Sequence, residues 1–158
     1  MPQLLEVGAI RGDLHVHTEY SGDAKSSVED VVARANALGY EYIAITDHGV
    51  DLRLNGIDEL AHAEIAEKLT RLRTVYPSML IMHGCELNIG KDGELDYDAA
   101  ERAKFDICLG SIHSYFDLDS KAQTERIITA MQDPAVRILG HMTARSIGKR
   151  PGIECDVD

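Results

Sequence analysis

The sequence predicts an α/β fold organised around a parallel sheet or barrel. Short β-branched and apolar runs alternate with segments of helical periodicity, and the alternation recurs along the whole chain. Gly, Pro and helix-capping residues separate these segments. Strands joined by helical crossovers form right-handed βαβ units, in which neighbouring strands run parallel. A chain of 158 residues with 44% apolar residues is long enough for one domain with a buried core.

Five segments are typical of strands. The first alternates polar and apolar side chains, which is the period-2 pattern of a strand. The second is a β-branched apolar run of the kind found in buried parallel strands, and the other three are similar. In order along the chain, strands are expected over residues 11–17, 40–46, 79–87, 106–113 and 136–141.

Four segments between these strands show helical spacing of apolar residues. Ser27 fits the N-cap of the first helix, and Gly39 is a typical stop signal behind it. Pro77 and Pro134 follow the second and the last of these segments, where a helix cannot continue. Helices are therefore expected over residues 27–38, 57–75, 98–103 and 123–131.

Charge and cysteine content restrict the possible functions. The formal net charge is -11, so the bare surface should repel a polyanion and does not suit a nonspecific nucleic-acid binder. Bound divalent cations would reverse that sign within a pocket, so a phosphate substrate is still compatible. Cys85, Cys108 and Cys155 follow no metal-site spacing, and no signal peptide or long apolar run is visible. We expect a cytoplasmic protein with reduced thiols and no membrane span, with Cys85 and Cys108 in the core.

Each expected strand ends on a residue type that binds metals. These residues are His15, His17, His48, Glu86, His113 and His141. Sites in parallel sheets and barrels form at the carboxyl ends of the strands. A single histidine there is more often an ordinary core or surface residue, but five strand ends in register are hard to explain by chance. Imidazoles with a carboxylate predict a site for zinc, manganese or iron.

Two further histidines fall outside this register. His62 lies in the middle of the helix expected over 57–75 and is expected to be exposed. His83 precedes Glu86 by three residues, so strand alternation should turn its ring to the opposite face. Neither histidine is expected to belong to the site.

Six short motifs follow one another along the chain. They are Asp13-Leu-His-Val-His-Thr18, Ser21-Gly-Asp23, Thr46-Asp-His48, Gly84-Cys-Glu86, Ser111-Ile-His113 and Gly140-His141. In this order they resemble the successive motifs of PHP (polymerase and histidinol phosphatase) domains. The finer similarity of Ile10–His15, Thr124–Ile128 and Gly140–Arg145 is to the PHP domain attached to bacterial family X DNA polymerases.

The resemblance implies a fold and its extent. PHP domains form a distorted (β/α)7 barrel, so residues 11–158 would supply about its first five β/α units, and residues 1–10 a lead-in or linker. The family continues with two more strands that carry an Asn and an Asp-x-His pair of ligands. We therefore expect a fragment of a longer protein or a truncated form. Two open sheet edges should then produce either self-association across the open seam or marginal stability.

The resemblance also implies a cluster of up to three divalent metals, Mn, Zn or Fe. The implied ligands are His15, His17, Asp23, His48, Glu86, His113 and His141. His15 and His17 would hold one metal, and Glu86 would bridge it to a second. His113 and His141 would complete the second metal, and Asp23 and His48 would belong to a third. Asp23 follows Ser-Gly, one residue later than in the usual Ser-Asp-Gly order.

Further residues acquire roles by the same resemblance. Asp13, Asp47 and Ser111 are similar to groups that orient ligating imidazoles. Arg145 would meet a substrate phosphate, which its planar guanidinium suits, or would simply be a solvated residue of a basic tail.

The implied activity is hydrolysis of phosphate esters by water that the metals activate. One substrate class is DNA 3′ ends, as exonuclease or 3′-phosphatase, with polymerase-type domains on a longer chain. A small phosphate monoester of the histidinol-phosphate type is the alternative, favoured by the negative charge and by the lack of a basic, aromatic stripe. A non-catalytic structural module is the third possibility, although the candidate ligands argue against decay by substitution.

Overall fold

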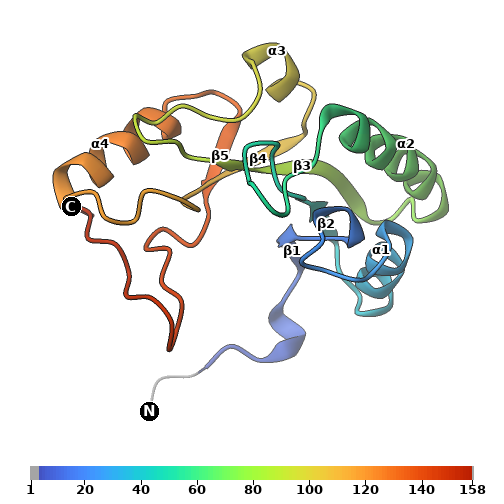
Figure 1. Ribbon diagram of the computed structural model, residues 1–158. Coiled ribbons are helices and arrows are strands. Elements are labelled where there is room, and N and C mark those ends of the chain that lie inside the picture. Colours follow the sequence, from blue (N-terminus) through green and yellow to red (C-terminus); the bar gives the residue numbers. More distant parts are fainter. Residues whose placement is uncertain (1–3, 158) are drawn as a thin grey trace.

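The five strands form one curled sheet. The computed structural model describes residues 4–157. The strand order is β1-β2-β3-β4-β5, and each neighbouring pair is parallel. The helices lie on the outer side of the curl, and the inner side is open (Figure 1). The expected α/β architecture is confirmed, as half of a barrel built from five strands.

All the elements expected from the sequence are present, with ends that differ by at most a few residues. The strands are β1 Gly12–Val16, β2 Tyr42–Ile45, β3 Leu80–Asn88, β4 Ile107–Ser111 and β5 Val136–Leu139. The α-helices are α1 Val28–Ala37, α2 Glu59–Val75, α3 Ala99–Arg102 and α4 Ser120–Met131. Two 3-10 helices, η1 Val7–Ala9 and η2 Glu19–Ser21, flank β1.

Side-chain caps fix where the helices begin. Ser27 Oγ accepts a hydrogen bond from the backbone N–H of Asp30, as expected of an N-cap. Gly39, just beyond α1, has a φ of 76°, a left-handed conformation that favours glycine. Helix α4 begins three residues earlier than predicted, because Asp119 caps it by accepting from the N–H of Ala122.

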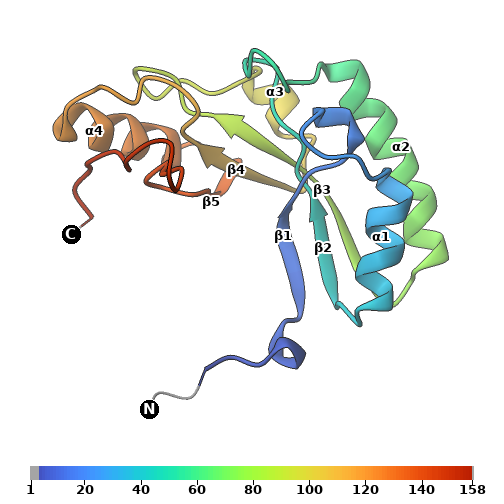
Figure 2. The same ribbon diagram turned by 60° about the horizontal axis from the view of Figure 1, so that its bottom comes forward.

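Strand β3 is the longest, and its two halves pair with different neighbours. Residues Leu80 to His83 pair with β2, whereas Gly84 to Asn88 pair with β4. A Cβ on Gly84 would lie 2.8 Å from the carbonyl oxygen of Ile107, so glycine permits the close approach of β4 at this change of partner. Because β2 and β4 pair with different halves of β3, the sheet turns between these two strands (Figure 2). The turn brings the carboxyl ends of the other strands around the end of β3.

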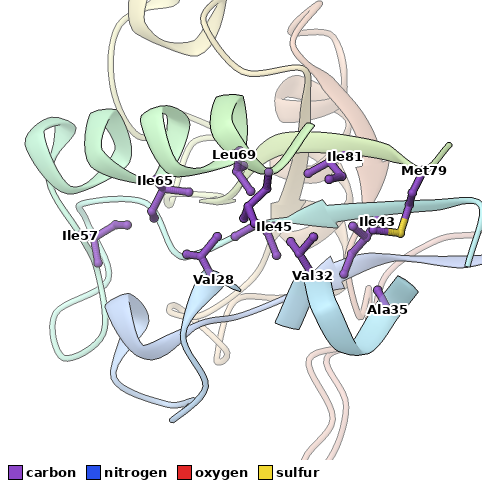
Figure 3. Packing of buried hydrophobic residues seen from close by; sticks show 11 residues of the cluster. Val28, Val32, Ala35, Ile43, Ile45, Ile57, Ile65, Leu69, Met79 and Ile81 are labelled. Atoms are coloured by element: carbon purple, nitrogen blue, oxygen red, sulfur yellow. The ribbon is translucent and has the colours of Figure 1, made fainter. Parts of the chain in front are cut away.

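The largest apolar cluster lies between α1, α2 and the first three strands. Val28 and Val32 of α1 meet Ile65 and Leu69 of α2 over Ile45, and all five are fully buried (Figure 3). Burial of each such side chain stabilises the fold by roughly 1.5–3 kcal/mol. This cluster fixes the outer helices on β1–β3, and so the ends of these strands.

A second apolar group packs beneath β3, β4 and β5. It contains Cys85, Leu87, Cys108 and Val136. Both cysteines are fully buried and unpaired, which confirms that they are core residues. Within residues 4–157, no helix is both long and apolar enough to cross a membrane.

The segment before β1 lies apart from the core. Leu4, Leu5 and Val7 are almost fully exposed. Residues 1–3 lie outside the described part of the chain, and the assignment of 1–10 as a lead-in or linker stays a prediction.

Candidate metal centre

The carboxylate of Glu86 lies at the centre of a ring of imidazoles. Glu86 is in the second half of β3 and is 0% exposed. Its Oε1 lies 2.8 Å from His141 Nε2 and 3.3 Å from His113 Nε2. Its Oε2 lies 3.0 Å from His48 Nδ1, 3.2 Å from His15 Nε2 and 3.2 Å from His17 Nε2. The strand-end residues predicted from the sequence therefore meet at one point.

The backbone brings His48 directly beside this carboxylate. Beyond β2 the chain forms an isolated parallel bridge between His48 and Glu86. The N–H of Glu86 donates to the carbonyl of Asp47 at 3.1 Å, and the N–H of Gly49 donates to the carbonyl of Glu86 at 2.9 Å. Pairing of β2 with β3 thus continues past the regular strand and fixes the position of the His48 ring beside Glu86.

The donor set fits divalent metals better than it fits a hydrogen-bonded cluster. Both oxygens of Glu86 are buried, yet neither receives a hydrogen bond with acceptable geometry from the described residues. Buried carboxylates are normally hydrogen-bonded or bound to a cation, so this arrangement calls for a positive partner. Imidazole nitrogens around a shared carboxylate are typical ligands of zinc, manganese and iron.

Two groups of ligand atoms are close enough to hold a metal each. One is His15, Glu86 and His141, and the other is His17, His48 and Glu86. Within each group the ligand atoms lie within 4.8 Å of one another. The structure thus places His15 with His141 and His17 with His48, whereas the resemblance paired His15 with His17. The pairing that the resemblance implies stays a prediction, because the rings of His15 and His17 are also close, with centroids 5.2 Å apart.

Asp23 and His113 lie at the margin of the cluster. Asp23 Oδ2 is 3.0 Å from His48 Nε2, on the ring edge opposite Glu86, and its carboxylate is partly exposed. His113 belongs to neither group, although its Nε2 faces Glu86. Arg145 directly follows Ala144, is exposed, and has no ion pair with any residue from 4 to 157.

The contacts around Glu86 shift its protonation equilibrium strongly. Burial alone would raise the pKa of Glu86, but the surrounding imidazoles hold it well below its usual range. The largest contributions come from His113 and His141, followed by His15 and His17. The same contact raises the pKa of His141. Burial lowers the pKa of His48, but the carboxylates of Glu86 and Asp23 outweigh it and raise the pKa overall. Glu86 is therefore an anion, and metals must compete with protons for the nitrogens.

The residues expected to orient the imidazoles make no hydrogen bond to the rings within residues 4–157. The buried Asp47 carboxylate accepts hydrogen bonds from the N–H and Oγ1 of Thr18, each at 2.7 Å, and from Ser21 Oγ at 2.6 Å. Ser21 Oγ in turn accepts from the N–H of His48 at 3.0 Å. Asp13 accepts from the N–H of His15, and Ser111 Oγ is buried without a hydrogen-bond partner among the described residues. The expectation that Asp13, Asp47 and Ser111 orient the imidazoles stays a prediction.

The residue that does contact an imidazole in this way is Asn88. Its Oδ1 lies 2.7 Å from Nδ1 of His113. Sequence reasoning missed Asn88, although a signal was present. It follows Glu86 by two residues in β3, and side chains two apart on a strand share a face.

The expectation that His62 is exposed is wrong. His62 is only 2% exposed, because it lies on the same stripe of α2 as Ile65, Leu69 and Leu72, at helical spacing. Its ring packs 4.9 Å from that of Phe105. His83 also packs against Phe105, away from Glu86, as strand alternation predicted.

Comparisons with known proteins show which proteins this chain resembles. Residues 13–148 match the family model described as the PHP domain. The chain is 37% identical over 157 residues to the DNA polymerase/3′-5′ exonuclease PolX of Bacillus subtilis, covering 99% of this chain and 27% of that protein. It is 33% identical over 132 residues to a protein of Shewanella sediminis named as a probable phosphatase, covering 82% of this chain and 52% of that one. The chain thus spans about a quarter to a half of the length of these relatives.

A solved structure shows the fold in another protein. It is from Listeria monocytogenes, and its name assigns it provisionally to histidinol phosphatase hisK. It superposes with a TM-score of 0.53 at 17% sequence identity, covering 70% of this chain and 47% of that one.

Proposed function

Since the chain belongs to the PHP domain family, we propose that it hydrolyses phosphate esters with divalent metals held around Glu86. The observation that supports this most is the buried Glu86 carboxylate, which faces five imidazoles without a hydrogen bond from the described residues. The proposed ligands are His15, His17, Asp23, His48, Glu86, His113 and His141. Metals bound there would lower the pKa of a water and offset charge on phosphoryl oxygens. Manganese, zinc and iron all suit these donors.

The chain's own residues would bind and orient the substrate beside this cluster. Arg145 is proposed to contact a phosphate, since its guanidinium is exposed and has no ion pair within residues 4–157. A cavity of about 330 Å³ borders His113 and is lined partly by Arg53, Asp51 and Glu94. A substrate phosphate at the metals could extend its organic part into this cavity.

DNA 3′ ends are the substrate that we propose first, for exonuclease or 3′-phosphatase activity. The support is the similarity to the Bacillus subtilis protein, which covers 99% of this chain. Because that relative is much longer, polymerase-type domains on a longer chain would deliver the DNA. Their contribution would offset the unfavourable net charge of -11.

A small phosphate monoester is the second candidate. The negative charge and the acidic residues Asp51 and Glu94 around the cavity favour a small substrate for this domain by itself. The relatives named as probable phosphatases support the same candidate. A non-catalytic structural role, a cytoplasmic location and self-association across the open seam stay predictions.

One set of assays separates these candidates. The purified chain would be incubated in Mn²⁺, and in parallel in Zn²⁺ or Fe²⁺, with a 3′-recessed labelled duplex, a duplex ending in a 3′-phosphate, and p-nitrophenyl phosphate. Activity on either duplex that exceeds activity on p-nitrophenyl phosphate would support DNA processing. Hydrolysis of p-nitrophenyl phosphate alone would support the small-substrate candidate. No hydrolysis by a chain that binds metal would support the structural role.

Matched histidine variants control for contaminating activity. His141→Gln removes an imidazole that faces Glu86, whereas His83→Gln removes one on the opposite face of β3. We expect the first variant to lose most activity and the second to keep it. Equal losses in two folded variants would contradict the proposed site.

A further inference from the structure

A chain of buried polar groups leads away from His113. Nδ1 of His113 lies 2.7 Å from Oδ1 of Asn88. Nδ2 of Asn88 lies 3.0 Å from each carboxylate oxygen of Asp96. Asn88 is 8% exposed and Asp96 is 0% exposed, so water does not replace these contacts readily.

The chemistry of these groups fixes the direction of every hydrogen bond. The Asp96 carboxylate already accepts from the backbone N–H of Asp51 at 2.6 Å and from the N–H of Asn88, so it faces donors on these sides. The amide group of Asn88 must therefore point its NH₂ at Asp96, because its carbonyl oxygen would be repelled there. That orientation directs the Asn88 oxygen, an acceptor only, at the His113 ring.

Asp96 also connects two separate parts of the site. Through the N–H of Asp51 it holds the segment that follows His48, and through Asn88 it holds the end of β3. A Cβ on Gly49 would lie 2.5 Å from the Asp96 carboxyl carbon, so glycine is needed for this close approach. Displacement of Asp96 would therefore disturb both sides of Glu86.

We propose that Asn88 and Asp96 are positioning residues, which hold His113 with its proton on Nδ1 and the lone pair of Nε2 directed at Glu86. The role rests on the proposed function, because a free Nε2 is what a metal requires. Nε2 of His113 lies 3.3 Å from Glu86 Oε1, so both atoms could bind the same metal ion. Partners of this kind typically change metal affinity by about 10–100-fold.

The tautomer of His113 can be measured without metal or substrate. The full 158-residue chain, labelled with ¹⁵N and treated with chelator, would be studied near pH 8 by long-range ¹H–¹⁵N correlation, with His113→Gln used to assign the signal. We expect wild-type His113 to carry its proton on Nδ1. In Asn88→Leu, which lacks the acceptor, we expect a mixture dominated by the Nε2–H form. Wild-type His113 found as the Nε2–H tautomer would overturn the proposal.

Metal titration of the same variants tests the consequence. We expect Asn88→Leu and Asp96→Asn to bind Mn²⁺ and Zn²⁺ about tenfold or more weakly than wild type. The reciprocal variant N88D/D96N restores a donor facing an acceptor, so it should regain the Nδ1–H tautomer and part of the affinity. Glu125→Gln removes an exposed carboxylate of α4 that pairs with Lys121, and should change neither readout.

These outcomes separate the proposal from the proposed function. If wild type binds no metal but shows the Nδ1–H tautomer, the function fails while the positioning chain stands. If Asn88→Leu keeps the wild-type tautomer and affinity, the positioning role is wrong whatever the enzyme does. Thermal unfolding of each variant identifies any that fails to fold. If a variant does not fold, the tautomer of His113 in wild type still tests the proposal.

Discussion

His141 Nε2 lies 2.8 Å from Oε1 of Glu86, although one residue follows the last strand and the other belongs to the central one. On the far side of the same carboxylate, Oε2 lies 3.0 Å from Nδ1 of His48. One buried anion therefore joins the β1–β2 side of the sheet to the β4–β5 side. The site therefore forms only when the sheet curls and brings both sides to Glu86.

Asp47 is expected to stabilise the loop that carries Asp23. In Asp47→Asn the side chain keeps one acceptor oxygen, which can still serve the N–H of Thr18 and Ser21 Oγ. The NH₂ group that replaces the other oxygen cannot accept the hydrogen bond that Thr18 Oγ1 donates. A buried group left without its partner costs about 1–3 kcal/mol, so the free energy of unfolding should fall by about that amount. Urea unfolding at pH 7 measures it. Asp13→Asn, at an exposed carboxylate, is the control and should change stability by less than about 0.5 kcal/mol.

The buried histidines on the outer face should make the fold sensitive to acid. Burial lowers the pKa of His83 to about 4, and the pKa of His62 likewise to about 4. In the unfolded chain the pKa of each returns to about 6.5, so that state binds more protons between these values. Stability should therefore fall as the pH falls from about 6.5 toward 4.

The variant His83→Leu tests this directly. Between pH 7 and pH 5 it should lose about 1–2 kcal/mol less unfolding free energy than wild type, because one buried imidazole no longer resists protonation. Lys104 lines a surface cavity together with His62 and His83. Lys104→Leu adds a leucine there without removing an imidazole, and should keep the wild-type pH dependence. An unchanged slope in His83→Leu would show that this ring is protonated at no cost in the folded state.

The three cysteines should differ sharply in reactivity. Cys85 and Cys108 are fully buried, whereas Cys155 is partly exposed. Burial raises the pKa of the Cys108 thiol to about 12 and that of Cys85 well above its usual range, so neither forms thiolate readily. A colorimetric thiol reagent should titrate one cysteine in the native chain and all three in denaturant. Fast reaction of two or more native thiols would mean that the core of β3 and β4 opens.

The sequence predicted the converging strand ends because two simple rules apply to them. Side chains two apart on a strand share a face, and parallel strands end at one edge of a sheet. These rules placed His15, His17 and Glu86 correctly relative to one another. They could not predict that His15 would lie beside His141, because this depends on how strongly the sheet curls between β2 and β4.

The errors have local physical causes. The expectation of an exposed His62 considered only its polar side chain and its position in the middle of a helix. Its i+3, i+7 and i+10 neighbours, Ile65, Leu69 and Leu72, form the buried face of α2. The start of α4 was placed too late because the capping role of Asp119 was not recognised. The Asp96 contact with Asn88 joins β3 to a turn outside the regular elements, where periodicity gives no information.

The metal content of the purified chain shows whether Glu86 holds divalent metals. Wild type and Glu86→Gln would be incubated with Mn²⁺ or Zn²⁺, freed of unbound metal by gel filtration and analysed by elemental mass spectrometry. Glu125→Gln, at an exposed position of α4, is the matched control. Because Glu86 belongs to both candidate groups, we expect at least one bound metal per chain in wild type and in the control, and almost none in Glu86→Gln. Less than one metal per chain in wild type, or a wild-type content in folded Glu86→Gln, would contradict the account.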